Sequence, residues 1–305
     1  MTFSADLASL RQRLATLEKP ILPSGEHRGI LGCGYVGQAV AQAWKDEGHE
    51  ITATTTTSEK LNEMAKYISN PCLFEAGTSR DQLGFVQDLD GILVSIAPTR
   101  SSKSGVELYQ DVFFEGIKDL SKEIQNRQTT RPFQLIYLSS CGVYGDQGGA
   151  LTNEATELSS PHPVNQVLIE AEERVRSLQS ANVKVCILRL GGIYGPVRDI
   201  PSMLLSAAGS LIQRNGLNVP CWIHRDDIVK GINFAFSQNL SGTFNLVNDT
   251  QLSGQELTDR LCEQAGLPLA KWLTINTNDR VLNARVCNSK IKELGFSFSR
   301  PCLLN

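Results

Sequence analysis

The amino-acid sequence predicts an α/β protein built on a doubly wound parallel sheet, with a smaller lobe towards its C-terminal end. Three observations lead to this fold class. Residues 32–37 read Gly-Cys-Gly-Tyr-Val-Gly, and this G-x-G-x-x-G motif stands between a short apolar run and a helical pattern. Apolar runs alternate with helical patterns along most of the chain. Residues 91–96 are nearly all apolar, as expected for a parallel strand buried on both faces. Together these features are typical of a Rossmann-type sheet.

Composition, charge and cysteine spacing argue against several classes of protein and of binding site. The chain has 305 residues and a net charge of −3, so it lacks the basic surface that nucleic-acid binding requires. No apolar run approaches the length of a membrane span, and the N-terminus lacks the pattern of a secretory signal. None of the eight cysteines forms a C-x-x-C pair or clusters with the four histidines, so we expect no metal site. Free thiols in apolar runs favour a cytoplasmic protein.

Residues 4–18 carry the pattern of an amphipathic helix that Ser4 can cap and Pro20 ends. Its apolar stripe consists of Leu7, Leu10, Leu14 and Leu17. Because two heptads are too few for a convincing coiled coil, we expect this helix to dock on the body of the protein. A helix that forms a dimerisation seam is the alternative. This helix and the linker after it make up an N-terminal segment, residues 1–28.

The glycine motif predicts a dinucleotide site, in which each glycine has its own role. Gly32 allows a tight turn, Gly34 lets backbone approach a pyrophosphate, and Gly37 lets the following helix pack against its strand. Tyr35 and Val36 begin that helix, so their free N–H groups and the positive end of the helix dipole would hold the phosphates. Without a ligand, the same residues would be only a glycine-rich helix start.

The other elements alternate along the chain. We expect strands at residues 29–31, 50–54, 72–75, 91–96, 133–138 and 183–190. We expect helices after the glycine motif up to Gly48, and over residues 58–68, 106–126, 164–180 and 227–237. In an open sheet, ligands lie beyond the carboxyl ends of the strands, so the residues after the fourth strand should line the cofactor cleft. These residues are Ser95, Ile96, Ala97 and Pro98.

The end of the second strand bears on the choice between NAD and NADP. An acidic residue there hydrogen-bonds the adenosine ribose of NAD. This chain instead offers hydroxyl groups, which can donate to a 2′-phosphate, at Thr54, Thr55, Thr56, Thr57 and Ser58. We take the first three of these as candidate cofactor contacts and expect NADP(H) to be favoured over NAD(H). A threonine-rich turn that is indifferent to the phosphate is the alternative.

Several segments carry a family resemblance. They are GCGYVG at 32–37, LSSCGVYG at 138–145 with Glu154 downstream, ILRLGGIYGP at 187–196, CWIHRDDIV at 221–229 and GTFNLVND at 242–249. Together they resemble the extended short-chain dehydrogenase/reductase family, the NAD-dependent epimerase/dehydratase group, over residues 29–305. The resemblance implies a nucleotide-binding domain over 29–192 with 223–248, and a substrate lobe over 193–222 with 249–305. It also implies a homodimer through the helices at 106–126 and 164–180.

The chain departs from this family at the residues that transfer protons. Family members use a Ser or Thr, a Tyr and a Lys, because an isolated tyrosine is a poor base at neutral pH. Aligned on the Val-Tyr-Gly segment, the three positions fall on Ser140, Asn165 and Ile169. No lysine occurs between Lys122 and Lys184, and none of the six tyrosines has a lysine four residues later. The usual Tyr-x-x-x-Lys dyad is therefore absent.

Four interpretations of this departure remain open. Tyr144 or His224 acts as a replacement acid, although the resemblance favours structural roles for both, with His224 near a helix capped by Asp226. Alternatively, Asn165 orients the substrate while a water relays the proton. The third interpretation is a binding module without turnover, and the fourth is different chemistry on a ligand like a nucleotide sugar. Ser140 polarises a substrate oxygen in the catalytic interpretations, or else only caps its strand.

The sequence therefore favours an enzyme, an NAD(P)-dependent oxidoreductase or epimerase. Its expected substrate is a small polyol or a sugar-derived molecule, such as a nucleotide sugar, bound between Ser140, Asn165 and the lobe. A catalytically silent NADP(H)-binding regulatory or redox-sensing module is the alternative.

Overall fold

A computed structural model describes residues 25–76, 82–98, 105–158, 160–273 and 280–304. The predicted N-terminal helix at 4–18 lies outside these residues. The core of the molecule is a seven-stranded sheet in which every neighbouring pair is parallel. Its strands are β1 (His27–Leu31), β2 (Glu50–Thr55), β3 (Asn70–Leu73), β4 (Gly91–Val94), β5 (Phe133–Ser140), β7 (Val183–Leu190) and β11 (Gly242–Leu246).

The strand order is β11-β7-β5-β4-β1-β2-β3. The chain runs outwards from β1 in one direction and then restarts at β4 in the other direction, so the order reverses between these two strands. In doubly wound sheets, ligands bind at the carboxyl ends of the strands on either side of this reversal. The predicted fold class is confirmed.

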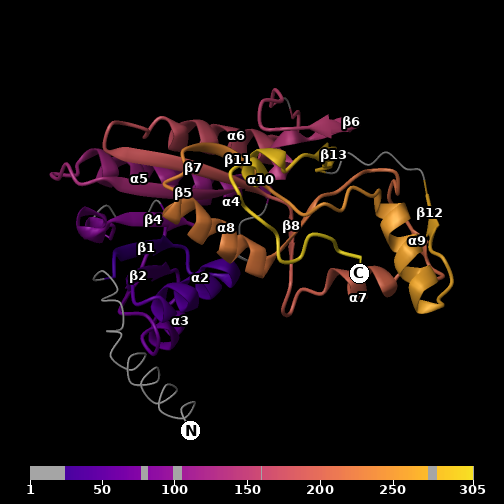
Figure 1. Cartoon of the computed structure of the whole chain (residues 1–305), viewed down its shortest axis with the longest axis horizontal. Coiled ribbons are helices and arrows are strands. Elements are labelled where there is room, and N and C mark those ends of the chain that lie inside the picture. The colour runs from indigo at the N-terminus through magenta and orange to yellow at the C-terminus, as the bar shows by residue number, and fades with distance from the viewer. Residues whose placement is uncertain (1–24, 77–81, 99–104, 159, 274–279, 305) are drawn as a thin grey trace, which may run out of the picture.

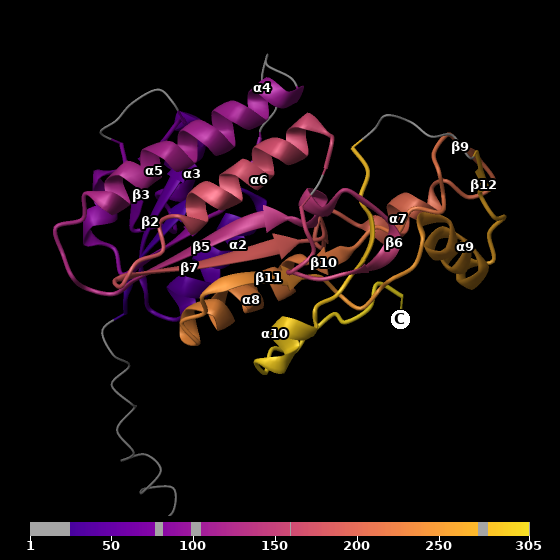
Figure 2. The ribbon, with the colours of Figure 1, turned by 90° about the horizontal axis from the view of Figure 1, so that it is seen from above.

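Helices cover both faces of the sheet (Figures 1 and 2). One face carries α2 (Tyr35–Asp46), α3 (Ser58–Met64) and α8 (Arg225–Ser237), which share one apolar cluster. The other face carries α6 (Pro163–Arg176) and a composite helix over residues 105–125. This composite consists of α4 (Gly105–Tyr109), a π-helical segment (Gln110–Glu115) and α5 (Gly116–Gln125). The sequence predicts a regular helix here, and periodicity did not indicate the π-helical segment.

Several predicted boundaries need correction. The strand expected over 91–96 ends at Val94, and the helix expected over 164–180 ends at Arg176. The helix expected over 58–68 ends at Met64, because the chain turns there to bring the buried Ile68 into the core ahead of β3. The third strand begins at Asn70 rather than at Cys72, since its register is set by pairing with Thr52 on β2.

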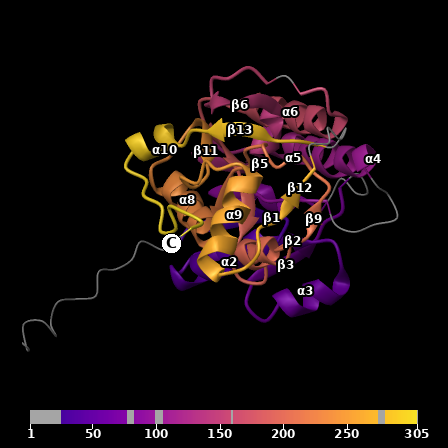
Figure 3. The same cartoon turned by 90° about the vertical axis from the view of Figure 1, so that its right-hand side faces the viewer.

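The C-terminal lobe lies beyond one end of the large sheet (Figures 1 and 2), and its helix α9 (Gly254–Ala265) faces the viewer in Figure 3. It contains α7 (Ile200–Leu205) and α9, which begins with a capping box formed by Ser253 and Glu256. Three two-stranded parallel sheets lie outside the large sheet. They pair β8 (Gly192–Tyr194) with β10 (Trp222–His224), β9 (Leu211–Ile212) with β12 (Lys271–Trp272), and β6 (Asp146–Thr152) with β13 (Asn283–Val286).

The shorter elements complete the chain. They are 3₁₀ turns at Gly84–Asp88 and Cys141–Tyr144, and helix α10 (Ser289–Glu293). No helix among the described residues is long and apolar enough to cross a membrane.

Candidate functional site

The glycine turn brings together the ends of three strands. Gly32 has φ +94°, and a Cβ atom there would lie 2.9 Å from backbone atoms of Ser95 and Ile96, which follow β4. Its amide N–H donates to the Thr54 hydroxyl at 2.9 Å, and the Cys33 N–H donates to the Thr54 carbonyl at 2.8 Å. The turn therefore has fixed neighbours on both sides, at the point where the strand order reverses.

The other two glycines differ sharply in their surroundings. A Cβ at Gly37 would lie 2.7 Å from the Gly32 carbonyl oxygen, so the first turn of α2 packs directly on the end of β1. At Gly34, no neighbouring atom lies within 4 Å of the position that a Cβ would take. The backbone at the start of α2 is thus open at the position where an approaching pyrophosphate needs space.

Tyr35 connects this turn with the C-terminal lobe. Its hydroxyl donates to the Pro196 carbonyl at 2.7 Å, across 161 residues of sequence. The guanidinium groups of Arg198 and Arg225 lie 4.2 and 5.2 Å from the centre of its ring. The start of α2 therefore presents positive charge as well as free N–H groups.

The threonines at the end of β2 and directly after it do not act as one group. Thr54 is 1% exposed and its hydroxyl accepts from Gly32, so, contrary to the sequence expectation, it holds the glycine turn and does not face a ribose phosphate. Thr55 is buried as well, and Thr57 caps α3 by accepting from the Lys60 N–H. Thr56 is exposed directly after the strand. The candidate ribose contact is therefore Thr56.

Ser140 ends β5 and caps the 3₁₀ turn that follows. Its hydroxyl oxygen accepts from the Gly142 N–H at 3.1 Å, which leaves its own hydrogen free to donate elsewhere. Asn165, in the first turn of α6, is 1% exposed. Its amide nitrogen donates to the Ser160 hydroxyl at 2.8 Å. Its amide oxygen accepts from Arg280 at 2.7 Å, so Asn165 positions an arginine rather than facing open space.

Sequence reasoning missed Arg280. This residue comes from the C-terminal lobe and reaches the position at which the family places its catalytic tyrosine. Besides its bond to Asn165, it donates to the Tyr109 hydroxyl at 3.1 Å, next to the π-helical segment. Asn165 and Arg280 are 115 residues apart, and no local pattern marks either as the partner of the other.

Tyr144 belongs to a buried polar network. Its hydroxyl donates to Asn245 at 2.7 Å and accepts from Arg189 at 2.9 Å. Arg189 also makes a bidentate pair with Glu172, whose carboxylate accepts from the Ser139 hydroxyl as well. Burial raises the pKa of the Tyr144 phenol, and the charge of Arg189 offsets only part of this effect. Tyr144 is 0% exposed and packs in the hydrophobic core beside the sheet. This burial argues against Tyr144 as the replacement acid for the missing tyrosine.

His224 also has a structural contact. Its Nδ1 accepts from the Asp226 N–H at 3.2 Å, so His224 itself is the N-cap of α8. The expectation that Asp226 caps this helix is therefore wrong, and Asp226 and Asp227 both lie in its first turn. The Asp227 carboxylate accepts from the N–H groups of Ser299 and Arg300, so it holds the C-terminal segment against α8. The ring of His224 packs edge-on against Tyr194.

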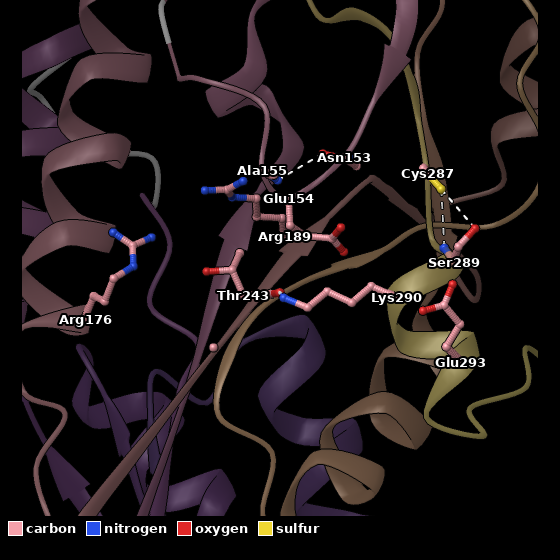
Figure 4. Close-up of a pocket in the computed structure, with 11 residues that line it drawn as sticks. Asn153, Glu154, Ala155, Arg176, Arg189, Thr243, Cys287, Ser289, Lys290 and Glu293 are labelled. Atoms are coloured by element: carbon pink, nitrogen blue, oxygen red, sulfur yellow. Dashed lines mark hydrogen bonds between the residues drawn. The ribbon is translucent and has the colours of Figure 1, made fainter.

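A cavity of about 660 Å³ lies at the β11 edge of the sheet, away from the glycine turn (Figure 4). Two of its charged groups bind backbone groups of the protein. The Lys290 ammonium donates to the Thr243 carbonyl at 2.8 Å, and the Glu154 carboxylate accepts from the Asn245 N–H at 2.7 Å. These bonds satisfy backbone groups of an edge strand, so we assign them to the fold. The described residues contain no cluster of three or more side chains suited to a metal ion.

The sheet order, the glycine turn and its open face define a nucleotide-binding α/β protein. The sequence model of the NAD dependent epimerase/dehydratase family matches residues 30–246. The chain belongs to this family, and the resemblance recognised in the sequence is confirmed.

Similar proteins cover nearly the whole chain. Protein YeeZ of Escherichia coli is 24% identical over 283 residues, which are 89% of this chain and 95% of that protein. The structure of MoeE5 in complex with UDP-glucose and NAD has a TM-score of 0.72 and 17% identity, covering 91% of this chain and 95% of that one. The human epimerase family protein SDR39U1 with NADPH has a TM-score of 0.69 and 17% identity, covering 90% and 96%. At these identities, the two structures show the shared fold.

Proposed function

We propose that this protein is an NAD(P)-dependent oxidoreductase or epimerase acting on a small polyol or a sugar-derived substrate, such as a nucleotide sugar. The observation that carries the proposal is the open glycine turn at the reversal of the strand order. Gly34 has free space in front of it, while Gly32 and Gly37 are tightly packed behind it. A dinucleotide pyrophosphate fits this arrangement, with the N–H groups of Tyr35 and Val36 as its donors. Ser95 to Pro98 would line the same cleft, because their backbone adjoins Gly32.

When bound, the nicotinamide would supply or accept a hydride. Ser140 would then donate its hydroxyl hydrogen to the oxygen on the reacting carbon of the substrate. Asn165 has no useful proton to exchange near neutral pH, and a guanidinium group offers donors but no acceptor. These residues can orient and stabilise charge, but they cannot replace the missing tyrosine as a proton carrier. We therefore expect slow turnover on ordinary nucleotide sugars, because general acid–base help contributes about 10² to 10⁴ in rate.

The asparagine at position 165, where family members have a tyrosine, supports a second candidate, a cofactor-binding regulator without turnover. It rests on Asn165 being buried, with its amide nitrogen and its amide oxygen each hydrogen-bonded within the protein. We also propose a preference for NADP(H), since the exposed Thr56 follows β2 where an acidic ribose partner would stand. A homodimer through α6 and the 105–125 helix and a cytoplasmic location remain proposals; the latter is supported by cysteines that are all free.

The test has two stages. Calorimetry with NADPH and NADH, on wild type and on Gly34→Val, should show binding in the wild type and its loss in the variant. Single-turnover nicotinamide absorbance with a panel of nucleotide sugars, on wild type and on Ser140→Ala, then separates enzyme from regulator. A lower chemical rate in Ser140→Ala with unchanged cofactor affinity supports the enzyme. Tight cofactor binding without turnover on any substrate supports the regulator, and absence of binding refutes both.

A further inference from the structure

A second cavity, of about 440 Å³, lies where the end of β8, the turn before α7, the N-cap of α8 and the C-terminal segment meet. Small-molecule sites have volumes of about 300–1,000 Å³, so this cavity has room for a small ligand. Neither the glycine motif nor Ser140 or Asn165 contributes to its lining. The cavity is therefore distinct from the proposed cofactor and substrate sites.

The cavity has several apolar lining residues, and hydrogen bonds hold its walls in place. These residues include Tyr194, Pro196, Pro201 and Leu303. The Pro196 carbonyl accepts from the Tyr35 hydroxyl at 2.7 Å, which ties this wall to the start of α2. The Leu303 N–H donates to the Thr250 hydroxyl at 2.8 Å, which fixes the C-terminal wall. A ligand would therefore meet an apolar surface that is already formed.

His224 adds a hydrogen-bond donor to this lining. Its Nδ1 accepts from the Asp226 N–H, so the ring hydrogen of the neutral imidazole is assigned to Nε2. Nε2 lies 3.1 Å from the position that a Cβ at Gly195 would take. Gly195 lines the same cavity and has φ +137°, a backbone conformation that favours glycine, so no side chain covers Nε2 from this neighbour. Among the described residues, Nε2 has no hydrogen-bond acceptor.

Arg300 adds a positive charge. Its backbone N–H donates to the Asp227 carboxylate at 2.9 Å, whereas in the described part of the chain its exposed guanidinium has no carboxylate partner. Asp199 also lines the cavity, but both of its carboxylate oxygens accept from Ser202 at the start of α7. Because Asp199 is exposed, water and salt screen its charge. The lining thus offers two uncommitted donors, one of them charged, next to an apolar surface.

We infer that this cavity binds a small organic acid with an apolar body. The carboxylate would accept from His224 Nε2 and from Arg300, whose polar end is free to turn towards it. The apolar body would pack against Pro196, Pro201 and Leu303. One carboxylate balances the one unpaired charge, whereas inorganic phosphate has no apolar part for these walls. The inference goes beyond the proposed function, since it adds a ligand that is neither the cofactor nor the substrate.

Calorimetry on the full chain tests the class of ligand with benzoate, benzamide, acetate and inorganic phosphate. Benzoate and benzamide have similar shapes and differ in charge, and acetate lacks the apolar ring. We expect benzoate to bind at least about tenfold more tightly than benzamide and than acetate. Equal binding of benzamide would overturn the role of the carboxylate, and equal binding of acetate would overturn the role of the apolar walls. Phosphate binding tighter than that of benzoate would overturn the choice of an organic acid.

Cys302 reports on the location of the ligand, because its exposed thiol lines the cavity. Benzoate at about ten times its Kd should slow the alkylation of Cys302 by iodoacetamide about tenfold, in proportion to the fraction of free sites. Cys72 on β3 should keep its rate, which peptide mass spectrometry measures in the same sample. An unchanged rate at Cys302, or equal slowing at Cys72, would overturn the assignment to this cavity.

Arg300→Gln should abolish the preference for benzoate over benzamide and leave the unfolding midpoint unchanged, because the Arg300 side chain has no partner among the described residues. Arg300→Lys should keep part of the preference. Arg214→Gln is the matched control, since Arg214 is also exposed in the lobe but does not line the cavity. A preference that persists in Arg300→Gln would contradict the inference. If that variant does not fold, the alkylation of Cys302 in the wild type decides.

NADPH separates this inference from the proposed function. We expect benzoate to bind equally well with and without saturating NADPH, since the cavity lies outside the cofactor cleft. Displacement of benzoate by NADPH would refute a separate site. Missing NADPH affinity in the wild type would refute the proposed function alone, because the benzoate measurement without nucleotide remains valid.

Discussion

Gly32 and Gly34 provide a matched pair of alanine substitutions that separates folding from ligand binding. At Gly32, alanine must adopt φ +94° and place its Cβ 2.9 Å from the backbone that follows β4. The left-handed backbone costs about 1–2 kcal/mol. The steric overlap costs about 1–3 kcal/mol, since backbone atoms cannot move aside as a side chain can. We therefore expect Gly32→Ala to lower the free energy of unfolding by about 2–5 kcal/mol.

At Gly34, the same substitution meets no atom within 4 Å, and the backbone φ is −91°. The free energy of unfolding should stay within about 0.5 kcal/mol of the wild type. Affinity for NADPH should nevertheless fall at least about tenfold, because the methyl group fills the space that the pyrophosphate needs. One glycine therefore serves the fold, and the other serves the ligand.

Denaturant unfolding followed by circular dichroism measures the first quantity, and calorimetry with NADPH measures the second. In thermal unfolding, the loss at Gly32→Ala corresponds to a midpoint lower by about 3 to 8 °C. Equal destabilisation by both variants would refute the argument about space at Gly34. Wild-type NADPH affinity in a folded Gly34→Ala protein would refute the assignment of the cofactor to this turn.

Three further predictions follow from the described contacts. Thr56→Asp should shift the preference from NADPH towards NADH, because a carboxylate repels a 2′-phosphate and binds a free ribose; calorimetry with both nucleotides checks this, and an unchanged ratio would contradict it. Glu172→Leu should lower the free energy of unfolding by about 3–5 kcal/mol, since it leaves the buried Arg189 without its carboxylate, and an unchanged denaturant midpoint would disprove the importance of this pair. Burial raises the pKa of the Cys33 thiol to about 12, so iodoacetamide at pH 8 should spare Cys33 and modify the exposed Cys302; peptide mass spectrometry showing equal rates would refute this.

The site shows where local patterns lose their predictive power. The threonine run is visible in the sequence, yet burial assigns its members different roles. Thr54 holds the glycine turn and Thr56 faces solvent, although they are only two residues apart. The cap of α8 shows the same limit, because Asp226 is the commoner capping residue and His224 performs the role. Such choices depend on which side chain the surrounding structure directs towards a particular N–H group.

By itself, the sequence determined the sheet, the glycine turn and the absence of the Tyr-x-x-x-Lys dyad. Apolar periodicity and glycine spacing are local properties, and strands such as Val183–Leu190 could be read with their boundaries because burial on both faces leaves a continuous apolar run. Only the tertiary structure decided which side chain contacts Asn165. Arg280 lies 115 residues from Asn165 in sequence, and the pairing of β13 with β6 sets the path of the chain just after it. A single arginine in a polar stretch has no periodicity to mark it. Its role arises from the long-range packing that fixes two of its nitrogens and leaves the third beside Ser140.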